Sequence, residues 1–274
     1  MSNFWQRTIT GAVYVSLIVG SILWHPYAFA SVMLIFTAIA SYEFLKLVSP
    51  NSAKHERIIN AAIIVLSFLC LTLTFLQIFP PAILVFPFLL FIPFVLELFG
   101  KNNEPFVHIG NVILGIVYIA LSLSLINLLF LFNNGSNIKP IGFEYKILLG
   151  FFIILWVNDT FAYLTGITIG KHKLFERISP KKTWEGAIGG LIFSMVTAFI
   201  LSLFFDVLIL RDWLIVAIII VVIGTIGDLV ESMLKRSAGC KDSGNILPGH
   251  GGILDRIDSI LFAAPFVVLY LITV

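Results

Sequence analysis

The side chains best suited to chemistry are concentrated in one polar stretch, residues 232–258, which lies between two apolar segments. This stretch holds four cationic side chains, three carboxylates, His250 and five glycines. Lysine, arginine and glycine backbone amides bind phosphates, and carboxylates bind a divalent cation alongside them. The composition of the stretch therefore predicts a site that holds phosphates, with a metal between them, next to lipid.

Two more carboxylates lie inside apolar segments. Asp159 falls within WVNDTFAY, and Asp228 falls within GTIGDLVES, where helical spacing puts Ser232 and Lys235 on the same face as Asp228. An ionisable side chain within a membrane span is costly, so it normally faces a cavity or a partner. A structural ion pair or a hydrogen-bonded cap is the alternative, but two such aspartates beside basic loops favour a functional site.

Asp255 and Asp258 are three residues apart at the start of the last apolar segment. On a helix they project from one face of the first turn, where the helix dipole favours carboxylates, so simple helix capping is one explanation. The other is a platform for a divalent metal, completed by an oxygen ligand from another helix. Mg²⁺ typically takes one or two protein carboxylates together with water and substrate phosphates.

A glycine-rich turn, NILPGHGG at residues 245–252, connects these carboxylates to the basic part of the stretch. Its backbone amides can approach an anion closely, although by itself such a turn can equally be a connector. His250 has no metal-binding spacing to another histidine. We therefore expect it to contact phosphate or to order the loop, and not to bind a metal or act as a general base.

A second basic segment spans residues 166–186 and reads GITIGKHKLFERISPKKTWEG. Gly170-Lys171 differs from a P-loop both in its distance from Gly166 and in the histidine that follows the lysine, which excludes that motif. Ser179 or Thr183 is expected to cap a helix start. The alternative role of this segment is a basic patch for anionic lipid headgroups.

The elements that must position these residues are membrane helices. Of the 274 residues, 59% are hydrophobic and 12% are charged, with a mean hydropathy of +1.05, which excludes a soluble domain because soluble domains carry about twice that charge fraction. The net charge of +2 gives no reason to expect a nucleic acid partner, and the two cysteines give no disulfide or metal spacing. A spanning helix needs about 20 apolar residues. The sequence predicts an all-α polytopic bundle of about nine transmembrane helices, unless a re-entrant pair replaces one, at roughly 9–24, 27–45, 59–79, 82–98, 110–132, 147–167, 186–205, 213–230 and 257–273.

Charge in the loops predicts the orientation. With nine spans, fourteen Lys and Arg residues fall on the side of the N-terminus and only three fall on the other side. By the positive-inside rule, the N-terminus and both polar segments face the cytoplasm and the C-terminus faces out. The first apolar run resembles a signal peptide, but a second apolar run crosses its cleavage site, so an uncleaved first span is expected. We expect one membrane domain over 1–274, with a scaffold-like part, 1–145, and a working part, 146–274.

The stretch from Ser232 to Asp258 resembles, without a break, the signature of the phosphatidate cytidylyltransferases, also called CDP-diacylglycerol synthases. Residues 158–163, NDTFAY, and 178–186, ISPKKTWEG, are also similar to this family, so the resemblance covers residues 156 to 260. One departure is Ile167, where many members of the family carry a basic residue. The resemblance implies transfer of CMP from CTP to phosphatidic acid, giving CDP-diacylglycerol and pyrophosphate, with one or two Mg²⁺ ions.

The resemblance also implies roles for particular residues. Expected metal ligands are Asp228 and Asp255, followed by Asp258 and Asp159. Residues expected to hold or order the reacting phosphates and nucleotide are Lys235, Arg236, Lys241, Asp242, His250 and Arg256. Residues expected to gather or contact CTP are Lys171, Lys181, Lys182, Gly251 and Gly252.

The resemblance also bears on the localisation of the protein, on its partners and on the competing functions. The family implies a multi-pass protein of the bacterial inner membrane, with a polar cavity at its cytoplasmic side, and a homodimer stays open. A CTP-dependent polyprenol or phytol kinase is the nearest alternative enzyme. An ion-coupled transporter using Asp159 and Asp228 is the alternative from another class, but it gives no reason for the basic, glycine-rich stretch.

Overall fold

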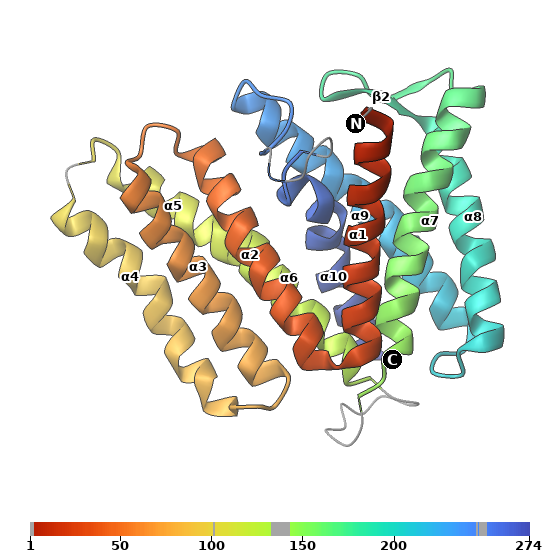
Figure 1. Cartoon of the computed structure of the whole chain (residues 1–274), viewed down its shortest axis with the longest axis horizontal. Coiled ribbons are helices and arrows are strands. Elements are labelled where there is room, and N and C mark those ends of the chain that lie inside the picture. Colours follow the sequence, from red (N-terminus) through yellow and green to blue (C-terminus); the bar gives the residue numbers. More distant parts are fainter. Residues whose placement is uncertain (1–2, 101, 133–142, 245, 247–250) are drawn as a thin grey trace. The chain divides into compact units, whose positions relative to one another are not determined.

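The chain is described by a computed structural model that covers residues 3–100, 102–132, 143–244, 246 and 251–274. Helices make up nearly all of its regular structure (Figure 1). The elements are α1 (Asn3–Trp24), α2 (Pro26–Val48), α3 (Lys54–Phe75), η1 (Pro80–Val85), α4 (Phe86–Phe99), α5 (Pro105–Gly115), η2 (Ile116–Leu121), α6 (Ser122–Leu125), η3 (Ile126–Phe130), α7 (Lys146–Ile169), β1 (Lys173–Phe175), β2 (Ser179–Thr183), α8 (Trp184–Phe204), α9 (Leu210–Ser237) and α10 (Leu254–Thr273).

Within the described residues, eight helical segments are long and apolar enough to cross a bilayer, and α1 adds a shorter apolar run, Thr8–Trp24. Each of the nine apolar runs predicted from the sequence coincides with one of these segments. The prediction of an all-α polytopic membrane protein is therefore confirmed. The eight segments are Pro26–Val48, Lys54–Phe75, Pro80–Phe99, Pro105–Phe130, Lys146–Ile169, Trp184–Phe204, Leu210–Ser237 and Leu254–Thr273.

Prolines set several of the helix starts. Pro26 begins α2 directly after α1 ends at Trp24, and Pro80 begins η1, which leads into α4. Proline is favoured at the first helical position because its missing N–H would have no helical partner there. At α2 the His25 ring completes the cap, since its Nδ1 accepts a hydrogen bond from the amide of Tyr27 at 3.2 Å.

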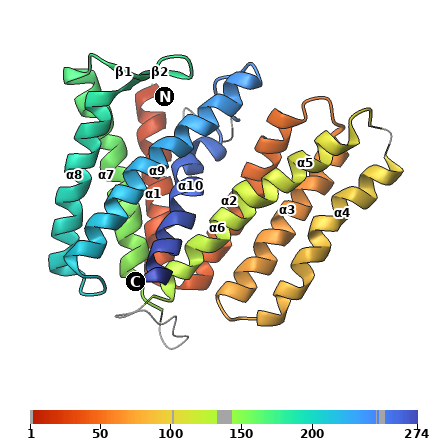
Figure 2. The ribbon, with the colours of Figure 1, turned by 180° about the vertical axis from the view of Figure 1, so that it is seen from behind.

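The described chain divides into two units, and the first consists of Met1–Leu128 with Ser237–Ile257. In this unit α3 packs against α2, against α4 and against the helical rod that runs from α5 to α6 (Figures 1 and 2). Phe44, Ile64 and Ile116 are fully buried where these helices meet. Many apolar side chains on α4 are exposed, with Phe99 at 81%, as expected for a helix that faces lipid.

The second unit consists of Leu129–Arg236 with Asp258–Val274. Its helices α7 and α8 lie side by side along most of their length (Figure 1). Gly189 in α8 faces the side chain of Thr165 so closely that an added Cβ atom would overlap it. Small residues allow helix backbones to approach closely in lipid, where no hydrophobic force drives them together. This close pairing fixes the position of the polar residues on α7.

The segment between α7 and α8 forms a short hairpin that the sequence did not predict. Strands β1 and β2 pair antiparallel, with Lys173 opposite Thr183 and Phe175 opposite Ser179. Thr183 also caps α8, because its Oγ1 accepts a hydrogen bond from the amide of Gly186 at 3.1 Å. Of the two capping residues predicted here, Thr183 is therefore the cap, and Ser179 begins a strand.

Candidate functional site

The second unit contains a cavity of about 560 Å³ lined by residues of α7, the hairpin, α8, α9 and α10. Its lining includes both charged and apolar side chains. The charged side chains are those of Asp159, Lys173, Lys181, Lys182 and Asp228, and the apolar ones include those of Ala162, Ile167, Leu174 and Ala187. The cavity thus brings together four residues predicted to act at the site, from positions up to 69 apart in sequence: Asp159, Lys181, Lys182 and Asp228.

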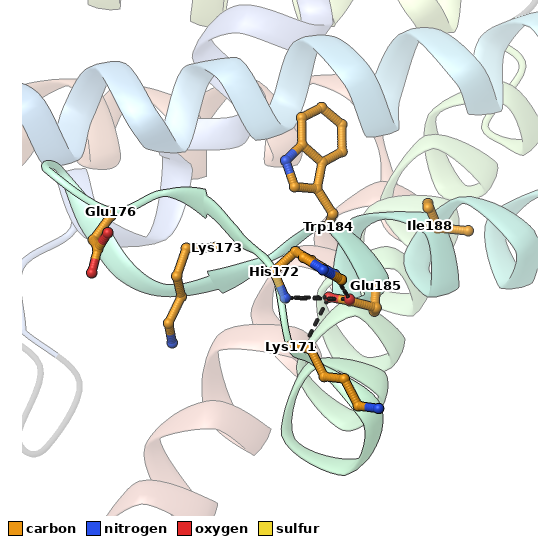
Figure 3. Close-up of a pocket in the computed structure, with 7 residues that line it drawn as sticks. All are labelled: Lys171, His172, Lys173, Glu176, Trp184, Glu185 and Ile188. Atoms are coloured by element: carbon orange, nitrogen blue, oxygen red, sulfur yellow. Dashed lines mark hydrogen bonds and ion pairs between the residues drawn. The ribbon is translucent and has the colours of Figure 1, made fainter.

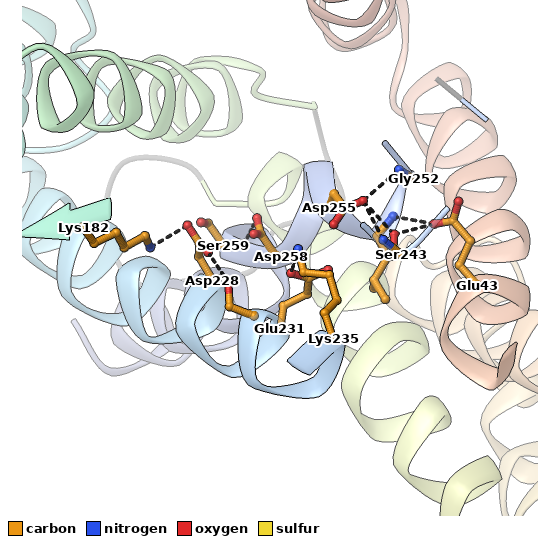
Figure 4. A network of polar contacts seen from close by, with 12 residues as sticks. Glu43, Lys182, Asp228, Glu231, Lys235, Ser243, Gly252, Asp255, Asp258 and Ser259 are labelled. Atoms are coloured by element: carbon orange, nitrogen blue, oxygen red, sulfur yellow. Dashed lines mark hydrogen bonds and ion pairs between the residues drawn. The ribbon is translucent and has the colours of Figure 1, made fainter. Parts of the chain in front are cut away.

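The strongest contact in this cavity is an ion pair between Lys182 on β2 and Asp228 on α9. Lys182 Nζ lies 2.5 Å from Asp228 Oδ2, and about a third of the aspartate side chain is exposed (Figure 4). The hydroxyl of Ser232, one turn further along α9, donates to Asp228 Oδ1 at 3.3 Å. This contact confirms that Asp228 and Ser232 share a helix face.

Lys235, which the sequence predicts to hold phosphates, pairs with a carboxylate of its own helix. Its Nζ lies 2.5 Å from Glu231 Oε2 in the same helix, and the side chain of Glu231 is fully buried (Figure 4). A buried carboxylate is costly unless it is paired, so the Glu231–Lys235 pair is a fixed part of this unit. Sequence reasoning missed Glu231, although Glu and Lys four residues apart on one helix are typical partners.

Asp258, at the start of α10, completes a group of carboxylates in the second unit. It interacts electrostatically with Asp228, Glu231 and Asp159, and its Oδ1 accepts a hydrogen bond from the amide of Ser259 at 2.7 Å. These neighbours repel a negative charge on Asp258, and the ammonium groups of Lys182 and Lys235 partly offset the charge of Asp228 and Glu231. Within the described residues, however, no three His, Cys, Asp or Glu side chains are arranged to hold a metal by themselves.

Asp255 lies in the first unit and holds two described residues that precede α10, Ser243 and Gly252. Its Oδ2 accepts hydrogen bonds from the amide of Ser243 at 3.0 Å, from the Ser243 hydroxyl at 2.9 Å and from the amide of Gly252 at 2.8 Å (Figure 4). Gly251 has φ of +84°, a conformation that favours glycine. The amide of Gly252 is thus used inside the loop, while a phosphate contact by Gly251 or Gly252 stays a prediction.

Glu43 is the second residue that sequence reasoning missed. Its position near the end of an apolar run suggested a carboxylate that reaches water, but the residue is only 3% exposed. Its Oε2 accepts hydrogen bonds from the amide of Leu254 at 2.9 Å and from the Ser243 hydroxyl at 3.2 Å (Figure 4). No feature of the sequence near Glu43 indicates these partners, which lie about 200 residues away.

A second cavity, of about 720 Å³, lies beside the hairpin and includes Lys171 (Figure 3). The carboxylate of Glu185 accepts hydrogen bonds from the amides of Lys171 and His172 at 3.1–3.2 Å and lies 2.6 Å from His172 Nδ1. The side chains of Lys171 and Lys173 extend away from Glu185 (Figure 3). Glu185 thus fixes the hairpin and leaves both lysine side chains directed elsewhere.

The remaining predicted site residues are on the surface or outside the described part. Arg236, Lys241, Asp242 and Arg256 are exposed. The backbone carbonyl of Arg256 accepts a hydrogen bond from the hydroxyl of Tyr14 at 3.2 Å, which ties α1 to the start of α10 within the first unit. His250 lies outside the described residues.

Comparison with known proteins bears on the same residues. The phosphatidate cytidylyltransferase of Staphylococcus saprophyticus subsp. saprophyticus is 42% identical over 176 residues, which make up 64% of this chain and 64% of that protein. The protein of the same name from Haemophilus influenzae is 47% identical over 125 residues, or 44% of this chain and 43% of its own. The aligned parts thus make up 64% and 43% of these relatives' length, which is less than two thirds in both.

A family model gives broader coverage than either relative. The model described as the cytidylyltransferase family matches residues 5–274, and so spans both units and every charged residue considered above. This chain belongs to the cytidylyltransferase family.

Proposed function

We propose that this protein is a phosphatidate cytidylyltransferase, which transfers CMP from CTP to phosphatidic acid and releases pyrophosphate. The observation that carries the proposal is the cavity of the second unit, whose lining combines three lysines and two aspartates with several apolar side chains. A lipid that ends in a phosphate needs both kinds of contact. The family of the chain and the names of its relatives support the same reaction.

The reaction requires little covalent chemistry from the protein. A phosphate oxygen of the lipid attacks the α-phosphorus of CTP, a new P–O bond forms, and the bond to the β-phosphate breaks as pyrophosphate leaves. The lipid phosphate needs no strong base, because its second pKa is about 6 and it is largely deprotonated at neutral pH. The main difficulty is to bring two polyanions together and to stabilise the charge that develops on the leaving group.

The lysines of the cavity meet this requirement. In the described part of the chain, the ammonium groups of Lys173 and Lys181 form no ion pair, so phosphates can bind them without displacing a carboxylate. Lys182 is paired with Asp228, and an entering phosphate would compete with that aspartate for the ammonium group. The cavity thus supplies positive charge for CTP and for the lipid phosphate.

Mg²⁺ fits the carboxylate group of the second unit. Asp228 and Asp258 would hold it, with Asp159 as a further candidate, and Asp255 stays a predicted ligand from the first turn of α10. Mg²⁺ uses hard oxygen ligands and usually takes only one or two carboxylates beside phosphate oxygens, so a protein site of three ligands is not required. When bound, the ion supplies charge stabilisation and an in-line geometry for the phosphates.

The apolar side chains that line the cavity suit the acyl chains of the lipid substrate. Ile167 and Tyr163 on α7 line the cavity and are also largely exposed, at 63% and 67%. Acyl chains can therefore lie along this surface of α7 while the phosphate reaches the lysines. Ile167 in place of a basic residue is consistent with this contact. By the positive-inside rule, the charge distribution of the loops supports an orientation in which this end of the helices faces the cytoplasm of a bacterial cell.

The deciding experiment uses purified protein in mixed micelles with phosphatidic acid, Mg²⁺ and CTP labelled at the α-phosphate. We expect the label in a lipid, with one pyrophosphate released for each labelled lipid. In a parallel reaction, CTP labelled at the γ-phosphate should transfer no label to lipid. Label passing from the γ-phosphate to a lipid alcohol would instead identify a kinase, and no turnover by folded protein would favour a transporter.

A further inference from the structure

Glu43 lies in α2, within an apolar segment long enough to span a membrane, and its carboxylate is almost completely buried. It is one of the few buried carboxylates of the first unit, and its Oε1 accepts no hydrogen bond from any residue that the structure describes. A buried acceptor without a partner lowers stability, and an ionisable residue inside a membrane span normally has a functional reason. The contacts of its other oxygen indicate what this reason is.

The contacts of Glu43 Oε2 are all with residues at or before the start of α10, the helix that carries Asp255. Glu43 Oε2 accepts from the amide of Leu254, the first residue of α10, and from the Ser243 hydroxyl. The same hydroxyl and the amide of Ser243 bind Asp255 Oδ2. Glu43 therefore both caps the start of α10 and holds the serine that fixes Asp255.

The glycines of the loop show how closely Glu43 is enclosed. A Cβ atom added to Gly244 would overlap the carboxylate of Glu43, and one added to Gly252 would overlap Glu43 and Ser243. Gly244 and Gly252 thus lie close against the Glu43 carboxylate, which leaves no space for a side chain at either glycine. A change in the length of the side chain at position 43 must therefore move the backbone at Gly244 and Gly252.

We propose that Glu43 is a positioning residue for the cytidylyl transfer, which acts through Ser243 and Asp255 and does not touch either substrate. This inference rests on the proposed function for its kinetic test, but the geometry alone leads to a structural test as well. The position of the acceptor oxygen, and not the charge of residue 43, is the decisive property. The side-chain amide oxygen of a glutamine at this position can accept both hydrogen bonds that Glu43 Oε2 accepts.

The kinetic test compares two conservative variants. Glu43→Gln keeps the length of the side chain and an acceptor oxygen, so its kcat should stay within about threefold of the original. Glu43→Asp keeps the charge but withdraws the carboxylate by about 1.5 Å, the length of one C–C bond. Its kcat should fall at least tenfold, while the KM for CTP changes less than about threefold because the lysine cavity is unaltered.

Glu97→Asp is the matched control. Glu97 on α4 is also a largely buried carboxylate of the first unit, but it binds Asn102 and His108 instead of the loop. The same shortening there should leave kcat within twofold. The double variant Glu43→Asp/Ser243→Ala should be no slower than the slower single variant, because both changes interrupt the same chain of hydrogen bonds.

Hydrogen–deuterium exchange provides a readout that does not depend on activity. The amides of Gly252 and Leu254 should exchange at least tenfold faster in Glu43→Asp and unchanged in Glu97→Asp. Normal kcat or normal exchange in Glu43→Asp would overturn the proposal, and so would a Gln variant as slow as the Asp variant or additive effects in the double variant. A folded original protein that makes no CDP-lipid would refute the proposed function, and the exchange result would still decide the role of Glu43.

Discussion

At the scale of single residues, the central feature is the competition for Lys182. In this structure its ammonium group neutralises Asp228, and both belong to a cavity suited to phosphates and a cation. Binding of Mg²⁺ to the aspartate and of phosphate to the lysine would replace one ion pair by two. Each partner therefore has a role in the free and in the loaded protein, and removal of one leaves the other partly buried charge without its ion-pair partner.

Replacing Asp228 by Asn tests this arrangement, because it keeps the volume of the side chain and removes its charge. We expect CDP-lipid formation to fall at least 100-fold at saturating CTP, since Asn is a poor ligand for Mg²⁺ and leaves Lys182 unpaired. Activity is measured in mixed micelles, and size-exclusion chromatography shows that the variant is folded.

Asp206→Asn is the matched control for that variant. Asp206 also pairs with a lysine, since Lys146 Nζ lies 2.6 Å from its Oδ1, and this hydrogen bond lowers the pKa of the Asp206 carboxyl. The aspartate is 81% exposed and does not line the cavity of the second unit. Its amide variant should keep at least half of the activity. Equal activity of the two variants would remove Asp228 from the site.

At the scale of elements, the close pairing of α7 and α8 positions the cavity residues. Asp159 is carried by α7, and α8 continues directly from the strand that carries Lys181 and Lys182. The distance between these two helices therefore sets the distance between Asp159 and these lysines. Gly189 is one position at which this distance is sensitive to side-chain volume, because Thr165 lies directly opposite.

Gly189→Ala should separate the two helices. Alanine favours a helix by roughly 1 kcal/mol over glycine, but overpacking of a closely packed contact costs about 1–3 kcal/mol. We expect a lower thermal midpoint in detergent together with weaker binding of CTP. Gly20→Ala is the control, because a Cβ atom on Gly20 of α1 meets nothing within 4 Å. That variant should be as stable as the original or more so, and an equally stable Gly189→Ala protein would contradict the argument.

The elements also show which features the sequence could predict. The spans were predictable because Pro26 and Pro80 separate one apolar run from the next. Asp159 and Asp228 were found because a charged residue within a span is rare. The hairpin was not predicted, since its two strands are short and lie among basic residues. Glu43 was not recognised as buried, because its partners follow from packing between distant segments. Glu231 was not recognised either, because a single sequence does not fix which of several lysines pairs with it.

At the scale of the whole molecule, the chain order does not follow the division into units. The loop and helix start at 237–257 pack with the N-terminal helices, while α7, α8 and most of α9 and α10 form the second unit. The predicted division at residue 145 into a scaffold-like part and a working part stays a prediction. Within the described residues, Glu43 of α2 nevertheless contacts Ser243 and Leu254, so an N-terminal helix holds part of the stretch that resembles the family signature.

Orientation in the membrane is a property of the whole molecule that two native cysteines make testable. Cys240 lies in the basic stretch, partly exposed, whereas Cys70 is buried in α3. If the basic loops face the cytoplasm, a membrane-impermeant maleimide should label Cys240 in inside-out vesicles and leave it unlabelled in right-side-out vesicles, with Cys70 unlabelled in both. A cysteine introduced as Asp206→Cys, in the loop before α9, should show the opposite pattern because it follows an odd number of spans. Labelling of both positions from the same side would contradict the nine-span topology, and reversed labelling of both would place the lysine cavity on the outer face, where cytosolic CTP could not reach it.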